Sequence, residues 1–200
     1  MGITSYIDPV PAIFLGSSEV SVKEMVGAFS IYANKGVYNV PMMVTKIEDK
    51  YGNVLANFYP ESREVITENT AFLMANLLQG VVDEGTGRRL RFRYGFKNQI
   101  GGKTGTTQNH SDGWFIGITP DLAGGVWVGA EDRSIHFQNL ANGQGASMAL
   151  PIWALFMQKV YADKSLAVPQ GDFQKPNGVN HVLDCGDADR EGMTDYDSSD

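Results

Sequence analysis

The feature that most constrains this chain is a series of three short strand-like segments between residues 98 and 130, joined by very short links. The segments cover residues 98–107, 112–119 and 123–130, and each is apolar or rich in glycine. Strands with links this short are antiparallel neighbours, because a parallel pair needs a long crossover connection. Helical spacing of apolar residues is found on both sides of them, over 21–35, 68–82 and 146–162. The sequence therefore predicts a mixed α/β fold in which helices pack on an antiparallel sheet.

Local signals define the helix ends and a further hairpin. Ser21 and Glu24 have the spacing of a capping box, and Thr67 can cap the second helix. A hairpin is predicted from 41–48 and 54–59 around a turn at 50–53, and residues 1–20 are predicted to form a loop. The stripes predicted to face the core are Val22, Met25, Val26, Phe29 and Ala33 in the first helix, Ala71, Met74, Leu77, Leu78 and Val81 in the second, and Met148, Ile152, Leu155, Phe156 and Val160 in the third.

Composition excludes several classes of protein. The chain has 200 residues, of which 42% are hydrophobic, and this is the size and composition of one globular domain. No apolar run approaches the roughly 18 residues that a membrane span needs. Residues 1–15 lack the basic region and cleavage site of a signal peptide. The single cysteine, Cys185, cannot form an internal disulfide.

The negative charge is concentrated at the C-terminus. The formal net charge is −7, of which residues 184–200 contribute −6, so the preceding part is nearly neutral. We therefore divide the chain into a body, residues 1–168, and an acidic tail, residues 169–200, which we predict to be disordered. A neutral body gives no reason to expect a nucleic-acid partner, and the one basic cluster, at 88–93, is interpreted as a solvated loop.

The segment that can carry chemistry is Lys103-Thr104-Gly105-Thr106, within a predicted strand that also contains Gly101 and Gly102. Glycine weakens a strand and often marks the close approach of a ligand or of another backbone. The side chains that remain are an ammonium and two hydroxyls, beside backbone N–H groups. Charge-assisted hydrogen bonds from such groups can hold a carboxylate, and the N–H groups can pair with an extended peptide. The segment is therefore a candidate site for an anionic, peptide-like ligand.

Other known motifs fit these residues and their neighbours less well. A phosphate-binding loop needs a glycine at position 97, which is a lysine, and a helix after the lysine rather than a strand. A glycine-rich strand without any site stays open as an alternative. Ser111 stands between His110 and Asp112, but neighbours in sequence do not make a catalytic triad. His110 either lines a cleft or lies in a solvated loop, and no metal site or cofactor is expected because no Cys/His ligand spacing is present.

The sequence resembles the transpeptidase domain of the bifunctional, class A penicillin-binding proteins. Lys103-Thr104-Gly105 matches the K-T-G motif that penicillin-binding proteins share with class A β-lactamases. The resemblance extends over about residues 1–163, in the C-terminal part of that domain. Further segments occur in the order typical of that family: Leu15-Gly16-Ser17-Ser18-Glu19-Val20, Gly80-Val81-Val82, Gly85-Thr86-Gly87, Asp112-Gly113-Trp114-Phe115-Ile116-Gly117 and Val126-Trp127-Val128-Gly129.

The resemblance implies a role for each matched residue. Lys103 orients and polarises the site, and the hydroxyls of Thr104 and Thr106 hold the terminal carboxylate of a D-Ala-D-Ala stem peptide or of a β-lactam. The backbone N–H of Thr106 forms half of an oxyanion hole, and Gly105 leaves room for the ligand. Trp114 and Trp127 are expected to pack on the sheet. The implied fold is a partial penicillin-binding/β-lactamase-like transpeptidase fold, and the implied parent is a serine-type D-Ala-D-Ala transpeptidase with a glycosyltransferase domain upstream.

One departure from the family pattern is large. The acyl-enzyme mechanism needs a serine followed by lysine three residues later, S-x-x-K, and a second motif, S-x-N, and neither occurs in this sequence. Both motifs normally precede the stretch present here. The chain is therefore expected to be a fragment with the third motif and without the nucleophile, and by itself to be inactive.

The expected surroundings follow from the same resemblance. The parent protein is expected on the extracytoplasmic face of the bacterial cytoplasmic membrane, in the periplasm, anchored by an upstream segment. Expected partners are the peptidoglycan stem peptide, β-lactams and the rest of the same polypeptide, with self-association as one way to cover exposed apolar faces. The alternative function is a non-catalytic interaction module derived from the family.

Overall fold

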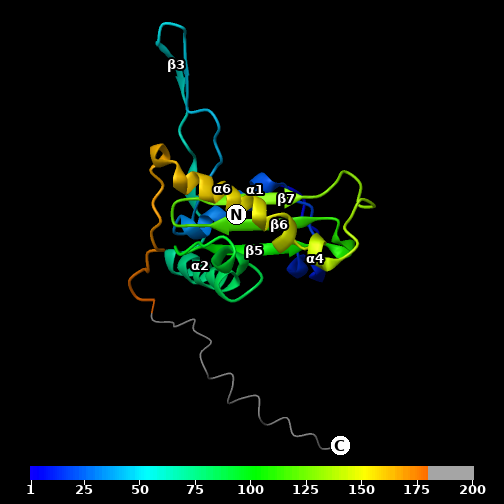
Figure 1. The fold of residues 1–200 in the computed structure, drawn as a ribbon. Coiled ribbons are helices and arrows are strands. Elements are labelled where there is room, and N and C mark those ends of the chain that lie inside the picture. The colour runs from blue at the N-terminus through cyan, green and yellow to red at the C-terminus, as the bar shows by residue number, and fades with distance from the viewer. Residues whose placement is uncertain (180–200) are drawn as a thin grey trace, which may run out of the picture.

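A computed structural model describes residues 1–179 as a sheet with helices on both faces and a ribbon that projects from it (Figure 1). The strands are β1 (Val37–Asn39), β2 (Lys46–Glu48), β3 (Val54–Asn57), β4 (Ser62–Glu64), β5 (Gly101–Thr106), β6 (Gly113–Ile118) and β7 (Ala123–Val128). The helices are α1 (Val22–Ala33), α2 (Glu68–Asp83), α3 (Arg89–Phe92), α4 (Leu140–Gly143), α5 (Gly145–Met148) and α6 (Leu150–Ala162). Short 3-10 helices are η1 (Pro11–Leu15), η2 (Gln108–His110) and η3 (Lys164–Leu166). The mixed α/β prediction is confirmed.

The central sheet has the strand order β5-β6-β7, and both pairings are antiparallel as predicted. Thr104 lies opposite Phe115, and Phe115 lies opposite Val126, so one transverse row carries an aromatic residue in the middle of the sheet. Among the strands of residues 1–179, β5 pairs only with β6, so it is an edge strand.

The two faces of the sheet are covered by different helices. Gly124 and Gly125 are neighbours on β7 and face opposite sides, as successive strand residues do. A Cβ at Gly124 would lie 3.0 Å from Trp153 Nε1 in α6, whereas one at Gly125 would lie 2.6 Å from Val26 Cγ2 in α1. α6 therefore packs on one face and α1 on the other. α2 lies beside β5, where Leu78 approaches Gly101.

The C-terminal helix differs from the prediction in two ways: it is divided into two helices, and a different side of it is buried. The predicted single helix over 146–162 is divided into α5 and α6, and Pro151, which has no backbone N–H, lies in the first turn of α6. α6 buries Leu150, Trp153, Ala154 and Met157. The predicted stripe is confirmed at Met148, which is buried, but it is wrong at Ile152, Leu155 and Phe156, which are 51%, 54% and 58% exposed. Trp153 decides the orientation, since its indole occupies the space that Gly117 and Gly124 leave on the sheet.

The helices predicted over 21–35 and 68–82 are confirmed as α1 and α2, but the residues that they bury differ from the predicted stripes. The capping box of Ser21 and Glu24 is present at α1, and Thr67 caps α2. α1 contacts β6 and β7 of the sheet and also α2 and β1. It therefore buries Gly27, Ala28 and Ile31 and leaves the whole predicted stripe half-buried. α2 buries Ala71, Ala75, Leu78 and Val82, while Leu77 is exposed.

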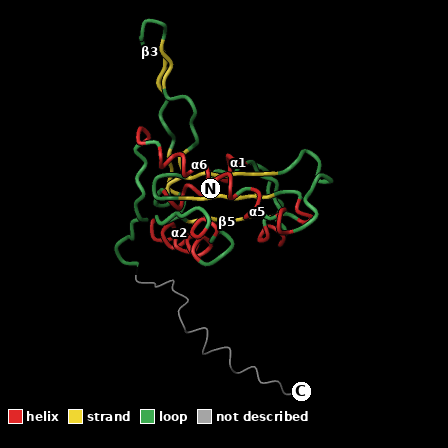
Figure 2. Tube along the Cα trace, viewed as in Figure 1, coloured by secondary structure: helices red, strands yellow, loops and turns green. Residues whose placement is uncertain are grey.

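A long ribbon leads from the end of α1 to the start of α2. β1 and β4 pair at its base, and β2 and β3 form the predicted hairpin at its tip, with a register irregularity after Ile47. The tube drawing shows the hairpin extending well away from the layered body (Figure 2). Large apolar side chains of the ribbon, including Met43 and Leu55, are exposed. The hairpin is therefore stabilised by its own local contacts.

Two loop predictions require correction. Residues 1–20 contain a 3-10 turn, η1, because Pro11 has the backbone geometry that suits a first helical position. The basic cluster is not a solvated loop throughout. Arg91 contacts Asp83 at 2.6 Å and donates to two backbone carbonyls, and Arg89 donates to the carbonyl of Ala146 at 2.8 Å. These arginines tie α3 to its surroundings.

The division between body and tail at residue 168 also differs. Phe173 lies within the predicted tail, but it is only 9% exposed and packs in one core cluster with Ala75, Leu78 and Ile118. Its backbone N–H donates to Gln99 Oε1 at 2.9 Å. The packed body therefore reaches Phe173, and residues 180–200 of the predicted tail lie outside the described residues. No helix within residues 1–179 has both the length and the apolar character needed to cross a membrane.

Candidate functional site

The K-T-G residues lie on the open edge of the central sheet. Thr107 N–H donates to Asp112 O at the end of the β5–β6 hairpin, so the odd-numbered residues of β5 direct their backbone groups toward β6. The N–H groups of Thr104 and Thr106 consequently point to the unpaired side. Lys103 Nζ donates to the carbonyl of Thr104 at 2.8 Å on that same side. Two backbone donors and an ammonium thus share one edge.

Lys103 retains donor capacity beyond that single bond. Its side chain is exposed, and none of the ion pairs formed within residues 1–179 includes it. An ammonium has three donor protons, and one is used by the Thr104 carbonyl. The positive charge at this edge is therefore available to an anion.

The two threonine hydroxyls are oriented by partners from outside the strand. Thr104 Oγ1 lies 2.7 Å from the hydroxyl of Thr86, which belongs to the loop between α2 and α3. Thr106 Oγ1 accepts the backbone N–H of Gly145, the first residue of α5, at 3.0 Å. A hydroxyl has one donor proton. Within residues 1–179 the Thr106 proton has no acceptor, and the Thr86–Thr104 pair likewise keeps one proton without an acceptor. The site can thus donate several hydrogen bonds to one ligand.

The glycines of the motif have a packing reason that differs from the expected one. A Cβ at Gly101 would lie 3.0 Å from Leu78 Cβ, and a Cβ at Gly102 would lie 2.9 Å from Phe115 Cζ. These two glycines admit α2 and the core aromatic ring rather than a ligand. At Gly105 the nearest atom is Trp114 Cβ, at 3.1 Å, so room for a ligand there stays a prediction.

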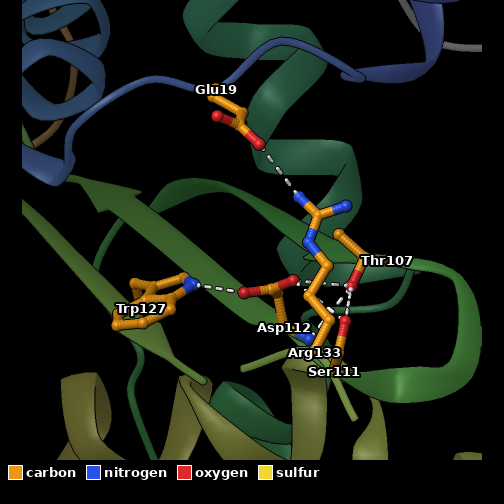
Figure 3. A network of polar contacts seen from close by, with 6 residues as sticks. All are labelled: Glu19, Thr107, Ser111, Asp112, Trp127 and Arg133. Carbon is orange, nitrogen blue, oxygen red and sulfur yellow. Dashed lines mark hydrogen bonds and ion pairs between the residues drawn. The ribbon is translucent and has the colours of Figure 1, made fainter. Parts of the chain in front are cut away.

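A polar network closes the turn that follows the motif (Figure 3). Asp112 Oδ2 accepts the hydroxyls of Thr107 and Ser111, each at 3.0 Å, and Oδ1 accepts Trp127 Nε1 at 2.9 Å. Arg133 extends over the network and contacts Glu19 at 3.4 Å. Trp127 was expected to pack on the sheet, but it is 40% exposed and donates to this carboxylate. The large indole in the core is that of Trp153.

The environment of Asp112 favours its charged form. Partial burial raises the pKa of the carboxyl, but the hydrogen bonds from Trp127, Thr107 and Ser111 and the charge of Arg133 together outweigh burial and lower the pKa. Asp112 is therefore an anion at neutral pH and can accept all of these bonds at once.

The remaining candidates lie near the turn or in separate cavities. His110 is half-buried rather than solvated, its Nδ1 is buried without a partner among the described residues, and it lines a cavity of about 250 Å³ with Val128, Phe137 and Met148. A second cavity, of about 320 Å³, lies between the end of α1, the start of α2 and Phe173. Neither cavity is lined by the K-T-G residues.

Sequence reasoning placed Lys103, Thr104 and Thr106 together but missed three residues that act on them. Thr86 appears in the sequence analysis only within a family segment, and Gly145 is not singled out there. Asp112 appears within another family segment and as an unsuitable triad member, without a role of its own. The Gly-Thr-Gly sequence at 85–87 is the one signal that could have identified Thr86. The contacts themselves join residues far apart in the chain.

Comparison with known proteins agrees with this architecture. The model of the family described as penicillin binding protein transpeptidase domain matches residues 12–145. Penicillin-binding protein 1A of Aquifex aeolicus is 33% identical over 170 residues, which are 85% of this chain and 22% of that protein. Penicillin-binding protein 2D of Bacillus subtilis is 32% identical over 188 residues, 90% of this chain and 26% of that protein. This chain therefore belongs to the penicillin-binding protein transpeptidase domain family, and it spans about a quarter of the length of these relatives.

Solved structures show the same fold. Penicillin-binding protein 1A from Haemophilus influenzae superposes with a TM-score of 0.74 at 24% identity, over 84% of this chain and 30% of that one. The penicillin-binding protein PonA1 from Mycobacterium tuberculosis superposes with a TM-score of 0.70 at 26% identity, over 84% of this chain and 44% of that one. The predicted resemblance and the predicted partial transpeptidase fold are confirmed.

Proposed function

We propose that this chain is the part of a peptidoglycan D,D-transpeptidase that holds the carboxylate end of a D-Ala-D-Ala stem peptide, and that β-lactams occupy the same position. In this proposal Lys103 supplies the positive charge, Thr104 and Thr106 donate their hydroxyl protons to the carboxylate, and Gly105 keeps the strand open to the ligand. The parent polypeptide is a serine-type D-Ala-D-Ala transpeptidase that works on the extracytoplasmic side of the cytoplasmic membrane.

The observation that carries the proposal is the convergence of unused donors on one strand edge. The ammonium of Lys103 and the free hydroxyl proton of Thr106 stand beside the outward N–H groups of Thr104 and Thr106. A carboxylate binds best where charged and neutral donors meet without competing acceptors. An extended peptide can also continue the sheet along this edge. The penicillin V complex of PonA1, a protein with the same fold, is consistent with a β-lactam as a second ligand class.

The Thr106 N–H is proposed to contribute to an oxyanion hole. One such donor typically stabilises the transition state of acyl transfer by about 3 kcal/mol. The serine that would attack is not in this sequence, which has neither S-x-x-K nor S-x-N. We therefore expect the chain alone to bind ligands reversibly and to form no covalent adduct with penicillin.

A peptide titration of the isotope-labelled chain tests the proposal. A peptide ending in D-Ala-D-Ala should shift the backbone amide signals of Thr104 and Thr106 saturably, and the same peptide with an amidated C-terminus should bind at least about tenfold more weakly. Lys103→Gln should weaken binding to a similar degree, while Lys97→Gln, at another exposed lysine, should not. Equal binding of the free and amidated peptides would contradict a carboxylate site.

A labelling experiment tests the covalent part separately. Incubation of the chain with a fluorescent penicillin should leave no label after denaturing electrophoresis. A stable labelled band would show that this chain contains a nucleophile, and it would contradict the expectation that the chain alone is inactive.

A further inference from the structure

We propose that Asp112 is a positioning residue for the K-T-G strand, because its carboxylate holds the β5–β6 turn closed and thereby fixes the Thr106 N–H at the open edge. The inference rests on the proposed function, since the direction of that N–H matters only to a ligand on the edge. Neither the family resemblance nor the matches to known proteins assign a role to Asp112.

The β5–β6 turn needs a restraint from outside its central residues. Asn109 and His110 are consecutive non-glycine residues with φ angles of 59° and 58°, a left-handed conformation that ordinary side chains adopt at a cost. Such a pair persists only where the surroundings hold it. The residues on either side of it, Thr107 and Asp112, supply that restraint. Their backbones are joined by Thr107 N–H to Asp112 O at 3.1 Å.

The same two residues, Thr107 and Asp112, are also joined by a reciprocal pair of hydrogen bonds that involves their side chains. The hydroxyl of Thr107 donates to Asp112 Oδ2 at 3.0 Å and accepts the Asp112 backbone N–H at 3.0 Å. Thr107 is bonded covalently to Thr106, so any opening of this pair rotates the peptide unit beside the outward N–H. Gly145 holds the Thr106 side chain from the other side, at 3.0 Å. Thr106 is thus fixed between two anchors.

Gly129, the residue that follows β7, makes room for the carboxylate of Asp112. A Cβ at Gly129 would lie 2.4 Å from Trp127 Cζ2 and 2.8 Å from Asp112 Oδ1. The absence of a side chain at Gly129 therefore permits the bond between Trp127 Nε1 and Asp112. This bond links the turn to β7, on the far side of the sheet from β5.

The outer part of the network contributes less. Arg133 and Glu19 are 70% and 89% exposed and meet at 3.4 Å, and such pairs add little in water. Glu19→Gln is therefore a suitable control that changes the charge near Asp112 without touching the turn.

The test compares four variants of the full 200-residue chain. Asp112→Asn and Thr107→Val should each shift the Thr106 amide signal and lower the affinity for the D-Ala-D-Ala peptide about tenfold, which corresponds to the loss of one hydrogen bond to a charged group. Thr107→Ser keeps the hydroxyl. It should return the Thr106 amide signal to its original position and the peptide affinity to within about twofold of the unmodified chain. Glu19→Gln should behave as the unmodified chain.

A stability control separates positioning from general weakening. Met157→Ala removes a buried side chain of α6 whose core cluster includes none of the residues of the turn, and it should lower the melting temperature while leaving the peptide affinity of the folded chain unchanged. Trp127→Phe deletes one donor to Asp112 and provides a milder variant should Asp112→Asn fold poorly. It should shift the Thr106 amide in the same direction.

The outcomes distinguish the two proposals. If the unmodified chain does not bind the peptide, the proposed function has failed, and the Thr106 amide still shows whether Asp112 controls that N–H. If the unmodified chain binds and Asp112→Asn binds as tightly with an unchanged Thr106 amide, only the positioning role is overturned. A Thr107→Ser variant as defective as Thr107→Val would overturn it too.

Discussion

Two β-hairpins of this chain end in turns closed by an aspartate, and they differ in what surrounds them. In the β2–β3 hairpin, Asp49 accepts the backbone N–H groups of Tyr51 and Asn53 at 2.8 Å and 2.9 Å. In the β5–β6 hairpin, Asp112 accepts two hydroxyls and an indole N–H. The first set of bonds stays within the turn, whereas the second reaches a third strand.

The packing of the two hairpins differs more than their turns do. β6 is covered by α6 on one face and by α1 on the other, and Phe115 is fully buried. The β2–β3 hairpin has no such cover within the described residues, and Leu55 is 66% exposed. A two-stranded hairpin is marginally stable by itself. The comparison shows that a carboxylate can define a turn, but that packing determines which hairpin belongs to the cooperative core.

The largest predicted effect is that of removing the side chain that covers β6. Trp153→Ala should lower the free energy of unfolding by about 3–5 kcal/mol, because the indole is buried against Phe115 and Phe96 and would leave a cavity. Leu55→Ala, in the projecting hairpin, should change it by less than about 0.5 kcal/mol. Chemical denaturation of both variants measures the difference. Equal losses would mean that the projecting hairpin is part of the core.

A smaller predicted effect concerns the glycine that anchors Thr106. Gly145→Ala would place a Cβ 2.4 Å from the backbone oxygens of Gly105 and Trp114, so α5 must move away at a cost of about 1–3 kcal/mol. It should also displace the Thr106 amide signal. The matched control is Gly80→Ala in α2, where nothing lies within 4 Å and where alanine should stabilise the helix by about 0.5–1 kcal/mol. A neutral Gly145→Ala would contradict the close contact between α5 and β5.

Both hairpins could be predicted from sequence, because alternation and turn residues are local signals. The buried side of α6 could not. Two stripes of that helix are apolar, and the choice between them depends on Gly117 and Gly124, more than twenty residues away along the chain. Trp153 was therefore missed although it is the largest fully buried side chain. Phe173 was missed for a related reason, since it is one aromatic residue in a polar segment and only its contact with α2 identifies it.

The candidate site was likewise predictable only where its residues are neighbours in the sequence. Lys103, Thr104 and Thr106 are contiguous, and the motif itself indicates an anionic ligand. Thr86 and Gly145 contact these residues from 18 and 39 positions away, and no sequence pattern specifies which hydroxyl or N–H will meet which threonine. Those contacts determine which protons remain free, so the donor set of the site follows only from the fold.

The smallest predicted effect is a difference in acid sensitivity between the two turns. Hydrogen bonds from Asn53, first its side chain and then its backbone, lower the pKa of Asp49 from its ordinary value of 3.8. The pKa of Asp112 is lowered from 3.8 as well, despite its burial. A carboxyl with a lowered pKa in the folded state adds stability above about pH 4, and this stability is lost as the pH falls through the lowered value.

Asp112 lies in the packed sheet and Asp49 in the projecting hairpin, so replacing each of them should change a different measured property. Asp112→Asn should remove about 1 kcal/mol from the free energy of global unfolding at pH 7 and flatten its decline below about pH 4, because Asp112 belongs to the packed sheet. Asp49→Asn should leave global unfolding unchanged and instead speed amide hydrogen exchange at Asn53, because that turn opens without the core. Denaturation curves between pH 2 and pH 7 and exchange at pH 7 measure the two responses. Identical responses would mean that the two turns belong to one cooperative unit despite their different packing.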